Sequence, residues 1–255
     1  MRAVLRGLAA LAVVLVLAVC AVRFAPATLA TRGVREASGG ALTLADARGT
    51  LVDGRARLVD SVHGVSVPVA WKVDTGAALG GTLVVRLGDG PGDPVRGIVR
   101  VTRDAIALEA ADITLPAALA RAWLPPVPMI DIGGDVRVTA PSWQVGAGAH
   151  GDARAYWTPA RVADARAETL DFGAVTATIE TRGDATVAVL SSAGGDTVIG
   201  GTLGVSGTRI DADITLTPRA ATPAPLLRAI EGFGAPAPAG GARFAYHGTL
   251  MPNPR

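Results

Sequence analysis

The pentapeptide Ala-Asp-Ile-Thr-Leu occurs twice in the chain, at residues 111–115 and 212–216. Each copy is followed by prolines, a short segment with helical spacing, and a Gly-rich turn that leads into a new strand-like run. An internal repeat indicates one supersecondary unit used more than once. Coincidence is the alternative in a chain rich in Ala, Thr and Leu, but order and spacing agree as well as letters. The repeat predicts two similar halves, residues 31–132 and 133–255.

Most of the chain after residue 40 alternates between apolar and polar residues. In one such run the apolar positions are Val65, Val67, Val69, Trp71 and Val73, and the positions between them are Ser66, Pro68, Ala70 and Lys72. A period of two is typical of a strand with one buried face. The 32 Gly and 17 Pro residues divide the pattern into short runs. Short connections make sequential strands antiparallel neighbours. We therefore predict an all-β fold, a mainly antiparallel twisted open sheet or a partial barrel or sandwich. We expect a bulge or a break at Pro141 and Ser142.

Two short helices interrupt the predicted strands, at residues 116–124 and 225–233. Pro116 fixes φ and suits a first helical turn, whereas Pro125 and Pro126 end the helix because neither can donate the next hydrogen bond. The second helix follows the second copy of the repeat in the same order.

The first of these helices carries the candidate binding residues. Leu119 and Trp123 are four residues apart and share one helical face, and Pro125 and Pro126 hold the following loop extended. The apolar pair either caps the end of the β core or docks on a partner, and the sequence leaves both interpretations open. We predict Leu119, Trp123, Pro125 and Pro126 as possible partner-binding residues.

Residues 5–22 form an apolar run that only Arg6 interrupts and that Arg23 closes. Roughly 17 to 25 residues span a bilayer, and long Arg side chains can reach the interfaces. We therefore predict an N-terminal transmembrane helix within residues 1–30, with a short cytoplasmic tail. The count of positive charges does not decide the orientation, but a short tail before a large domain favours a cytoplasmic N-terminus.

Two other interpretations of this run remain open. A cleaved signal peptide requires small residues before the cleavage site, which Ala25, Ala27 and Ala30 offer. A lipoprotein would use Cys20, although Val19 before it is bulkier than the residue usual at such sites. Cys20 is the only cysteine, so the chain forms no intramolecular disulfide.

The charged and nucleophilic residues show no catalytic spacing. The net charge is +2, but Arg is scattered along the chain, which predicts no nucleic-acid partner. The histidines His63, His150 and His247 are isolated, and Asp211 and Asp213 alternate with apolar residues as on a solvated strand face. We predict no catalytic, metal-binding or cofactor-binding residues, and therefore no enzyme.

Several phrases resemble the type II secretion system protein N (GspN) family. They are LPAALARAWLP, which a glycine turn follows, then VRVTAPSW and GDARAYW. Upstream, ALTLADARGTLVDGRARL resembles that family's GTLW-x-G-x-A segment, with Val52 where Trp is expected. The resemblance runs, with gaps, from the first helix to Leu250.

This resemblance implies an accessory inner-membrane component of the type II (general) secretion system. Such a protein assembles with the inner-membrane platform or the secretin, for export across the outer membrane of a Gram-negative cell. It favours a retained, single-pass anchor with the bulk of the chain in the periplasm. The alternative is a periplasmic protein that handles lipids or other hydrophobic ligands, and a groove lined by Val, Leu and Ile without closing strands would favour it.

Overall fold

The computed structural model describes most of the chain after residue 24. The described residues are 25–60, 64–90, 92–119, 131–146, 148–163, 169–220, 222, 224–231, 234–238 and 240–249. Their contacts divide the chain into two compact units, residues 1–95 (unit 1) and 96–255 (unit 2). The division at residues 132–133 that the repeat predicts is a different one, and it stays a prediction.

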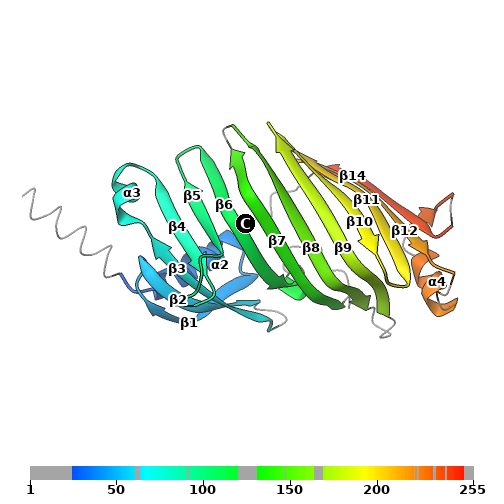
Figure 1. The fold of residues 1–255 in the computed structure, drawn as a ribbon, viewed down its shortest axis with the longest axis horizontal. Helices are drawn as coiled ribbons and strands as arrows, with labels where there is room; N and C mark the ends of the chain where they lie inside the picture. Colours follow the sequence, from blue (N-terminus) through cyan, green and yellow to red (C-terminus); the bar gives the residue numbers. More distant parts are fainter. Residues whose placement is uncertain are drawn as a thin grey trace, which may run out of the picture. The chain divides into compact units, whose positions relative to one another are not determined.

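Unit 1 is an antiparallel meander of four strands with two helices (Figure 1). Its elements are α2 (Thr28–Ala37), β1 (Leu42–Gly49), β2 (Asp53–Asp60), β3 (Ser66–Val73), α3 (Thr75–Leu79) and β4 (Leu83–Gly88). Helix α2 packs on β1, where the Thr31 hydroxyl donates to the Leu44 carbonyl at 3.3 Å. Pro68 pairs with β2, and pairing with β4 begins only at Ala70, so the missing N–H of Pro68 breaks no bond to β4.

Unit 2 is a longer antiparallel meander in which each strand pairs with the next along the chain, except that β14 lies between β12 and β13. Its strands are β5 (Gly97–Val101), β6 (Ala105–Pro116), β7 (Asp131–Gly146), β8 (His150–Ala163), β9 (Thr169–Arg182), β10 (Ala185–Ala193), β11 (Thr197–Ser206), β12 (Arg209–Pro218), β13 (Ala235–Pro236) and β14 (Ala242–Thr249). One helix, α4 (Ala224–Glu231), connects β12 to β13. The predicted all-β, antiparallel class is confirmed.

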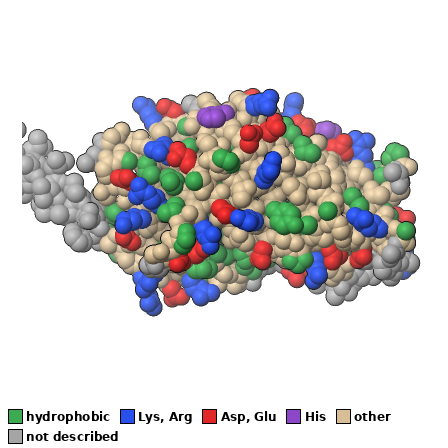
Figure 2. Space-filling view, in the orientation of Figure 1, with side chains coloured by type: hydrophobic (Ala, Val, Ile, Leu, Met, Phe, Trp, Pro, Cys, Tyr) green, Lys and Arg blue, Asp and Glu red, His purple; other side chains and the backbone are tan. Residues whose placement is uncertain are grey.

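The two faces of unit 2 differ in chemistry, because side chains directly opposite in antiparallel strands project to the same face. One register row contains Ala153, Ile179, Ala188, Leu203, Ala212 and Tyr246. The adjacent row on the other face contains Asp152, Glu180, Val187, Gly204, Asp211 and His247. We call these the apolar face and the polar face. Figure 2 shows acidic and basic side chains interspersed on the surface that it displays.

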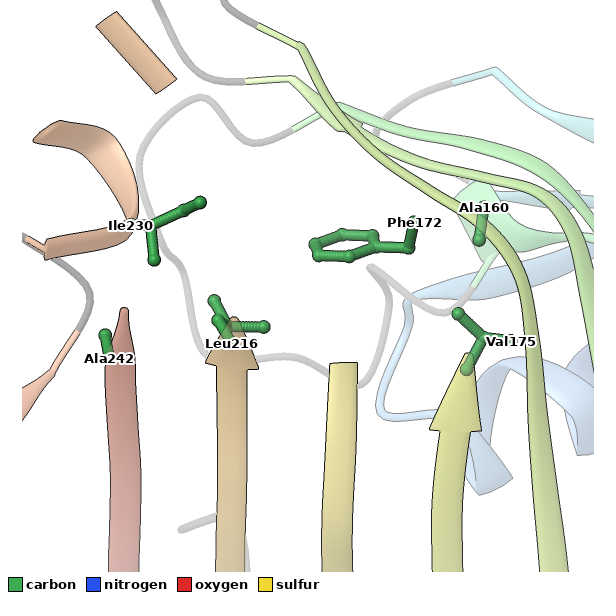
Figure 3. Packing of buried hydrophobic residues seen from close by; sticks show 6 residues of the cluster. All are labelled: Ala160, Phe172, Val175, Leu216, Ile230 and Ala242. Atoms are coloured by element: carbon green, nitrogen blue, oxygen red, sulfur yellow. The ribbon is translucent and has the colours of Figure 1, made fainter. Parts of the chain in front are cut away.

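The main buried cluster of unit 2 lies where α4 meets the ends of the strands. Ile230 of α4 is completely buried and points toward Leu216 of β12 and Ala242 of β14 (Figure 3). Phe172 lies between Ile230 and Ala160 in this view (Figure 3). The helix thus closes one end of the apolar face.

A second buried cluster consists of three alanines on adjacent strands, Ala111, Ala140 and Ala153. It lies beside an irregularity in β7, where the register with β8 shifts between Thr139 and Ser142. The bulge predicted at Pro141 and Ser142 is confirmed.

The two copies of the repeat occupy equivalent positions in two separate pairs of adjacent strands. Residues 111–115 lie in β6, which pairs with β7, and residues 212–216 lie in β12, which pairs with β14. Thr114 of the first copy is opposite Arg137, and Thr215 of the second is opposite Arg243. The matching register supports one unit used twice.

The helices differ in part from the prediction. The helix predicted at residues 225–233 is confirmed as α4. Pro116 does not begin a helix, because it is the last residue of β6 and pairs with Asp135; a single 3₁₀ turn follows at residues 117–119, and the rest of that predicted helix lies outside the described residues.

The expectation of only two short helices was wrong, since α2 and α3 were not predicted. Helix α3 has a clear local cause: the Asp74 carboxylate accepts hydrogen bonds from the N–H groups of Gly76 and Ala77, at 3.0 and 3.2 Å. Helix α2 is amphipathic and packs on β1.

Candidate functional site

The predicted partner-binding residues lie in and after the turn that follows β6. Leu119 is 3% exposed, so its side chain belongs to the core of unit 2. Trp123, Pro125 and Pro126 lie outside the described residues. Burial of Leu119 agrees with a capping role for this residue, and the partner-binding role of the segment stays a prediction.

Helix α4 shows what such a segment does after the second copy of the repeat. Ile230 is 0% exposed and packs with Leu216 and Ala242 (Figure 3). This end of the apolar face is therefore closed by an aliphatic side chain.

Two exposed ion pairs of the polar face repeat the same geometry. Arg137 Nε donates to Asp112 Oδ1 at 2.6 Å, and Arg243 Nε donates to Asp213 Oδ1 at 2.7 Å. In both pairs the second guanidinium nitrogen binds the other carboxylate oxygen, which makes the contacts bidentate. Each aspartate is the second residue of its repeat copy.

These arginines lower the pKa values of their partners. The hydrogen bond from Arg137 holds the pKa of Asp112 below its ordinary value, and that from Arg243 does the same to the pKa of Asp213. The carboxylates are therefore ionised at neutral pH and have no tendency to donate a proton. Asp211 and Asp213 do share a strand face, as predicted; their cationic partners were not predicted.

Two of the three predicted isolated histidines are described, and each contacts a neighbouring group. His150 Nδ1 donates to the Gly148 carbonyl at 2.6 Å, which leaves the ring beside its turn. His247 Nδ1 lies 2.8 Å from Asp211 Oδ1. His63 lies outside the described residues. Across the residues that the structure describes, no group of three or more His, Cys, Asp or Glu side chains is arranged to hold a metal ion.

A hollow of about 670 Å³ lies beside the bulge in β7. Asp152 and Glu180, directly opposite each other in β8 and β9, line it together with Arg154 and Arg182. Arg182 donates to Glu180 at 3.2 Å. Ala110, Ala140 and Pro141 also line it, so the hollow combines exposed charges of both signs with small apolar side chains.

The segment that resembles the family motif lies in the β1–β2 hairpin. The Trp71 ring of β3 covers Gly54, where an added Cβ would lie 2.4 Å from Cζ2 of the ring. Trp71 Nε1 also donates to the Leu51 carbonyl at 3.1 Å. An aromatic ring thus covers this segment from the neighbouring strand, although Val52 stands where the family motif has Trp.

The membrane anchor was predicted within residues 1–30, and its apolar run at residues 5–22 lies outside the described residues. Of the helices that the structure does describe, none combines the length and the apolar character needed to cross a membrane.

Comparison with known proteins gives one match, and it covers most of the chain. The sequence model of the family described as type II secretion system (T2SS), protein N, matches residues 40–245. No curated protein and no solved structure matches. The matched range contains the β1–β2 hairpin, both copies of the repeat and every strand from β1 to β13. The chain therefore belongs to the type II secretion system protein N family.

Proposed function

We propose that the protein is an accessory inner-membrane component of the type II secretion system, anchored by its N-terminus and assembled with other secretion proteins through its periplasmic β units. Membership of the protein N family is the observation that carries this proposal. The exposed, bidentate Asp–Arg pairs of the polar face present both charges on the surface of unit 2, which suits contact with a partner. We further propose that the protein is not an enzyme.

The membrane location rests on the apolar run at residues 5–22. Reporter proteins fused after Arg255 in the full chain should be active only when the reporter functions in the periplasm. A reporter that functions only in the cytoplasm, or a soluble mature protein beginning near Thr31, would contradict a retained anchor.

The segment after Leu119 is the proposed contact with the platform or the secretin. If Trp123 is a partner anchor, Trp123→Ala weakens capture of those proteins by roughly 2 kcal/mol or more and leaves melting unchanged. If it is a cap, the same change lowers stability by about 3 to 5 kcal/mol. Ile230→Ala is the matched control, because Ile230 is buried and its loss should affect melting alone.

A second candidate function is the handling of lipids or other hydrophobic ligands, which the open part of the apolar face favours. Leu203 and Tyr246, in one row, are 38% and 44% exposed, whereas Leu216, toward α4, is 3% exposed. Polar groups on this face bond to each other: the Thr181 hydroxyl accepts from Trp143 Nε1 at 2.7 Å and lies 3.0 Å from the Thr186 hydroxyl. Such a surface suits a ligand that requires no hydrogen bonds.

Two exposed apolar residues on opposite faces provide a matched test of this second candidate. Val189 of β10 is opposite Thr202, the neighbour of Leu203, and is 52% exposed on the polar face. A phosphatidylethanolamine with a photoreactive acyl chain, in phosphatidylethanolamine and phosphatidylglycerol vesicles, should label the full chain. Leu203→Asp should reduce labelling about tenfold, and Val189→Asp should not. Equal labelling of both variants would exclude a ligand on the apolar face.

A further inference from the structure

Three arginines lie together on one face of the β1–β2 hairpin in unit 1. Arg48 of β1 is directly opposite Arg55 of β2, and Arg57 is two residues further along β2 on the same face. Directly opposed residues have Cβ atoms about 5 Å apart. The hairpin therefore brings three guanidinium groups into one small area.

Among the described residues, these arginines form no ion pair of the kind seen in unit 2. Arg57 donates to the Ser66 hydroxyl at 2.7 Å. Across the described part of the chain, no ion pair reaches Arg48, Arg55 or Arg57. Like charges directly opposite in a sheet are destabilising. The repulsion between the opposed guanidinium groups therefore disfavours this pairing in the free protein. An anion bound between them would replace that repulsion with attraction.

The arginines surround a hollow of about 190 Å³. Ala56, Pro68 and Val69 are the apolar part of its lining, and Asp46 and Asp89 also contribute. Three cations and two carboxylates leave one net positive charge, which complements a phosphodiester. The apolar part suits the carbon atoms next to such a phosphate.

The hairpin turn that supports the arginines is fixed by several contacts. The Thr50 hydroxyl accepts hydrogen bonds from the N–H groups of Val52 and Asp53, at 3.2 and 3.0 Å. Gly49 has φ +86°, and an added Cβ would lie 2.5 Å from the Asp53 carbonyl oxygen. The turn therefore holds Arg48 and Arg55 opposite each other before any ligand arrives.

We propose that Arg48, Arg55 and Arg57 bind the phosphate group of an anionic ligand, either a phospholipid headgroup or a soluble phosphate. The planar guanidinium group donates in pairs to phosphate oxygens, which makes Arg the usual residue for this recognition. The run at residues 5–22 precedes α2 and the β1–β2 hairpin in the sequence, so an anionic phospholipid is the nearest source if the anchor is retained. That source, but not the phosphate chemistry, rests on the proposed membrane attachment.

The test uses the full chain in a neutral detergent and titration calorimetry with two probes, dihexanoyl phosphatidylglycerol and inorganic phosphate. Arg55→Gln should weaken binding about tenfold, since a hydrogen bond to a charged group is lost. Arg48→Gln, on the other strand, should give the same loss without lowering the melting temperature. Arg35→Gln is the matched control: it removes one exposed charge of unit 1 outside the hollow and should leave binding unchanged.

The two probes separate the sources. Binding of the lipid alone, with the expected dependence on Arg55, assigns a headgroup site, and equal binding of inorganic phosphate assigns a soluble ligand. If neither probe binds, or if Arg35→Gln weakens binding as much as Arg55→Gln, the proposal is wrong.

Failure of this site is distinguishable from failure of the secretion role. Loss of phosphate binding with intact co-isolation of secretion proteins rejects the site alone. Intact phosphate binding without those partners rejects the secretion role alone.

Discussion

The arginines of the two units are used in opposite ways. On the polar face of unit 2, Arg137 and Arg243 each bind an aspartate with two hydrogen bonds. In the β1–β2 hairpin of unit 1, Arg48 and Arg55 are opposite each other. Both sets are exposed and lie on strands, so the difference is one of register and partner. In unit 2 each arginine has its counter-charge within the unit, whereas the arginine cluster in unit 1 is suited to a negative charge from a ligand.

The largest expected effect tests whether unit 1 and unit 2 unfold independently. Ile230→Ala removes a completely buried side chain from the main cluster of unit 2 and should destabilise that unit by about 2 to 5 kcal/mol. Hydrogen exchange should show the loss in β9, β12 and β14, with protection in β1 to β3 unchanged. Equal loss in both units would mean that they unfold together.

Gly54→Ala tests the support of the arginine hairpin in unit 1. The added Cβ would lie 2.4 Å from Trp71 Cζ2 and 2.6 Å from the Thr50 carbonyl oxygen. Overpacking of this kind costs about 1 to 3 kcal/mol. Chemical denaturation followed by tryptophan fluorescence should report the loss. A variant as stable as the parent would show that the turn tolerates the change.

Arg48→Glu converts the like-charge pair of unit 1 into the opposite-charge arrangement of unit 2. Stability should rise, by less than about 1 kcal/mol, because repulsion is replaced by an exposed ion pair. Phosphate binding should be lost in the same protein. Thermal melting measures the stability, and calorimetry measures phosphate binding. A variant that melts at a lower temperature and still binds phosphate would contradict both expectations.

The smallest expected effect concerns acid. The pKa values of Asp112 and Asp213 are lowered from 3.8, so the stability that these pairs contribute is complete above that pH. This contribution is lost as the pH falls from 3.8 through the lowered pKa values of the folded protein, because the carboxylates become protonated there.

The control for acid is Asp213→Asn, which cannot lose a charge. Melting temperatures measured from about pH 5 downward should therefore fall less steeply for this variant than for the parent. Parallel curves would show that the pair contributes nothing to stability.

Much of the fold follows from local pattern. Alternation predicted the strands and their antiparallel order, and Pro141 predicted the bulge in β7, because each depends on neighbouring residues. Helix α2 was missed although its sequence is amphipathic at the helical period, a local pattern that was within reach. Helix α3 was within reach, since Asp74 precedes it as a cap.

The charged sites were harder to predict because they depend on register. Scattered arginines gave no footprint along the sequence, and only the pairing of β1 with β2 brings Arg48 opposite Arg55. The repeat gave only a weak signal for the other set, because each Ala-Asp-Ile-Thr-Leu copy is followed by a strand that contains the Arg. Arg137 follows Asp112 by 25 residues and Arg243 follows Asp213 by 30, so the match becomes visible only in the register of the strands.

The measurement that tests the secretion role most directly is crosslinking mass spectrometry of the full chain in native membranes of a secreting cell. We expect crosslinks from units 1 and 2 to the inner-membrane platform or the secretin. Crosslinks confined to lipid-handling proteins, or none to any secretion protein, would contradict it.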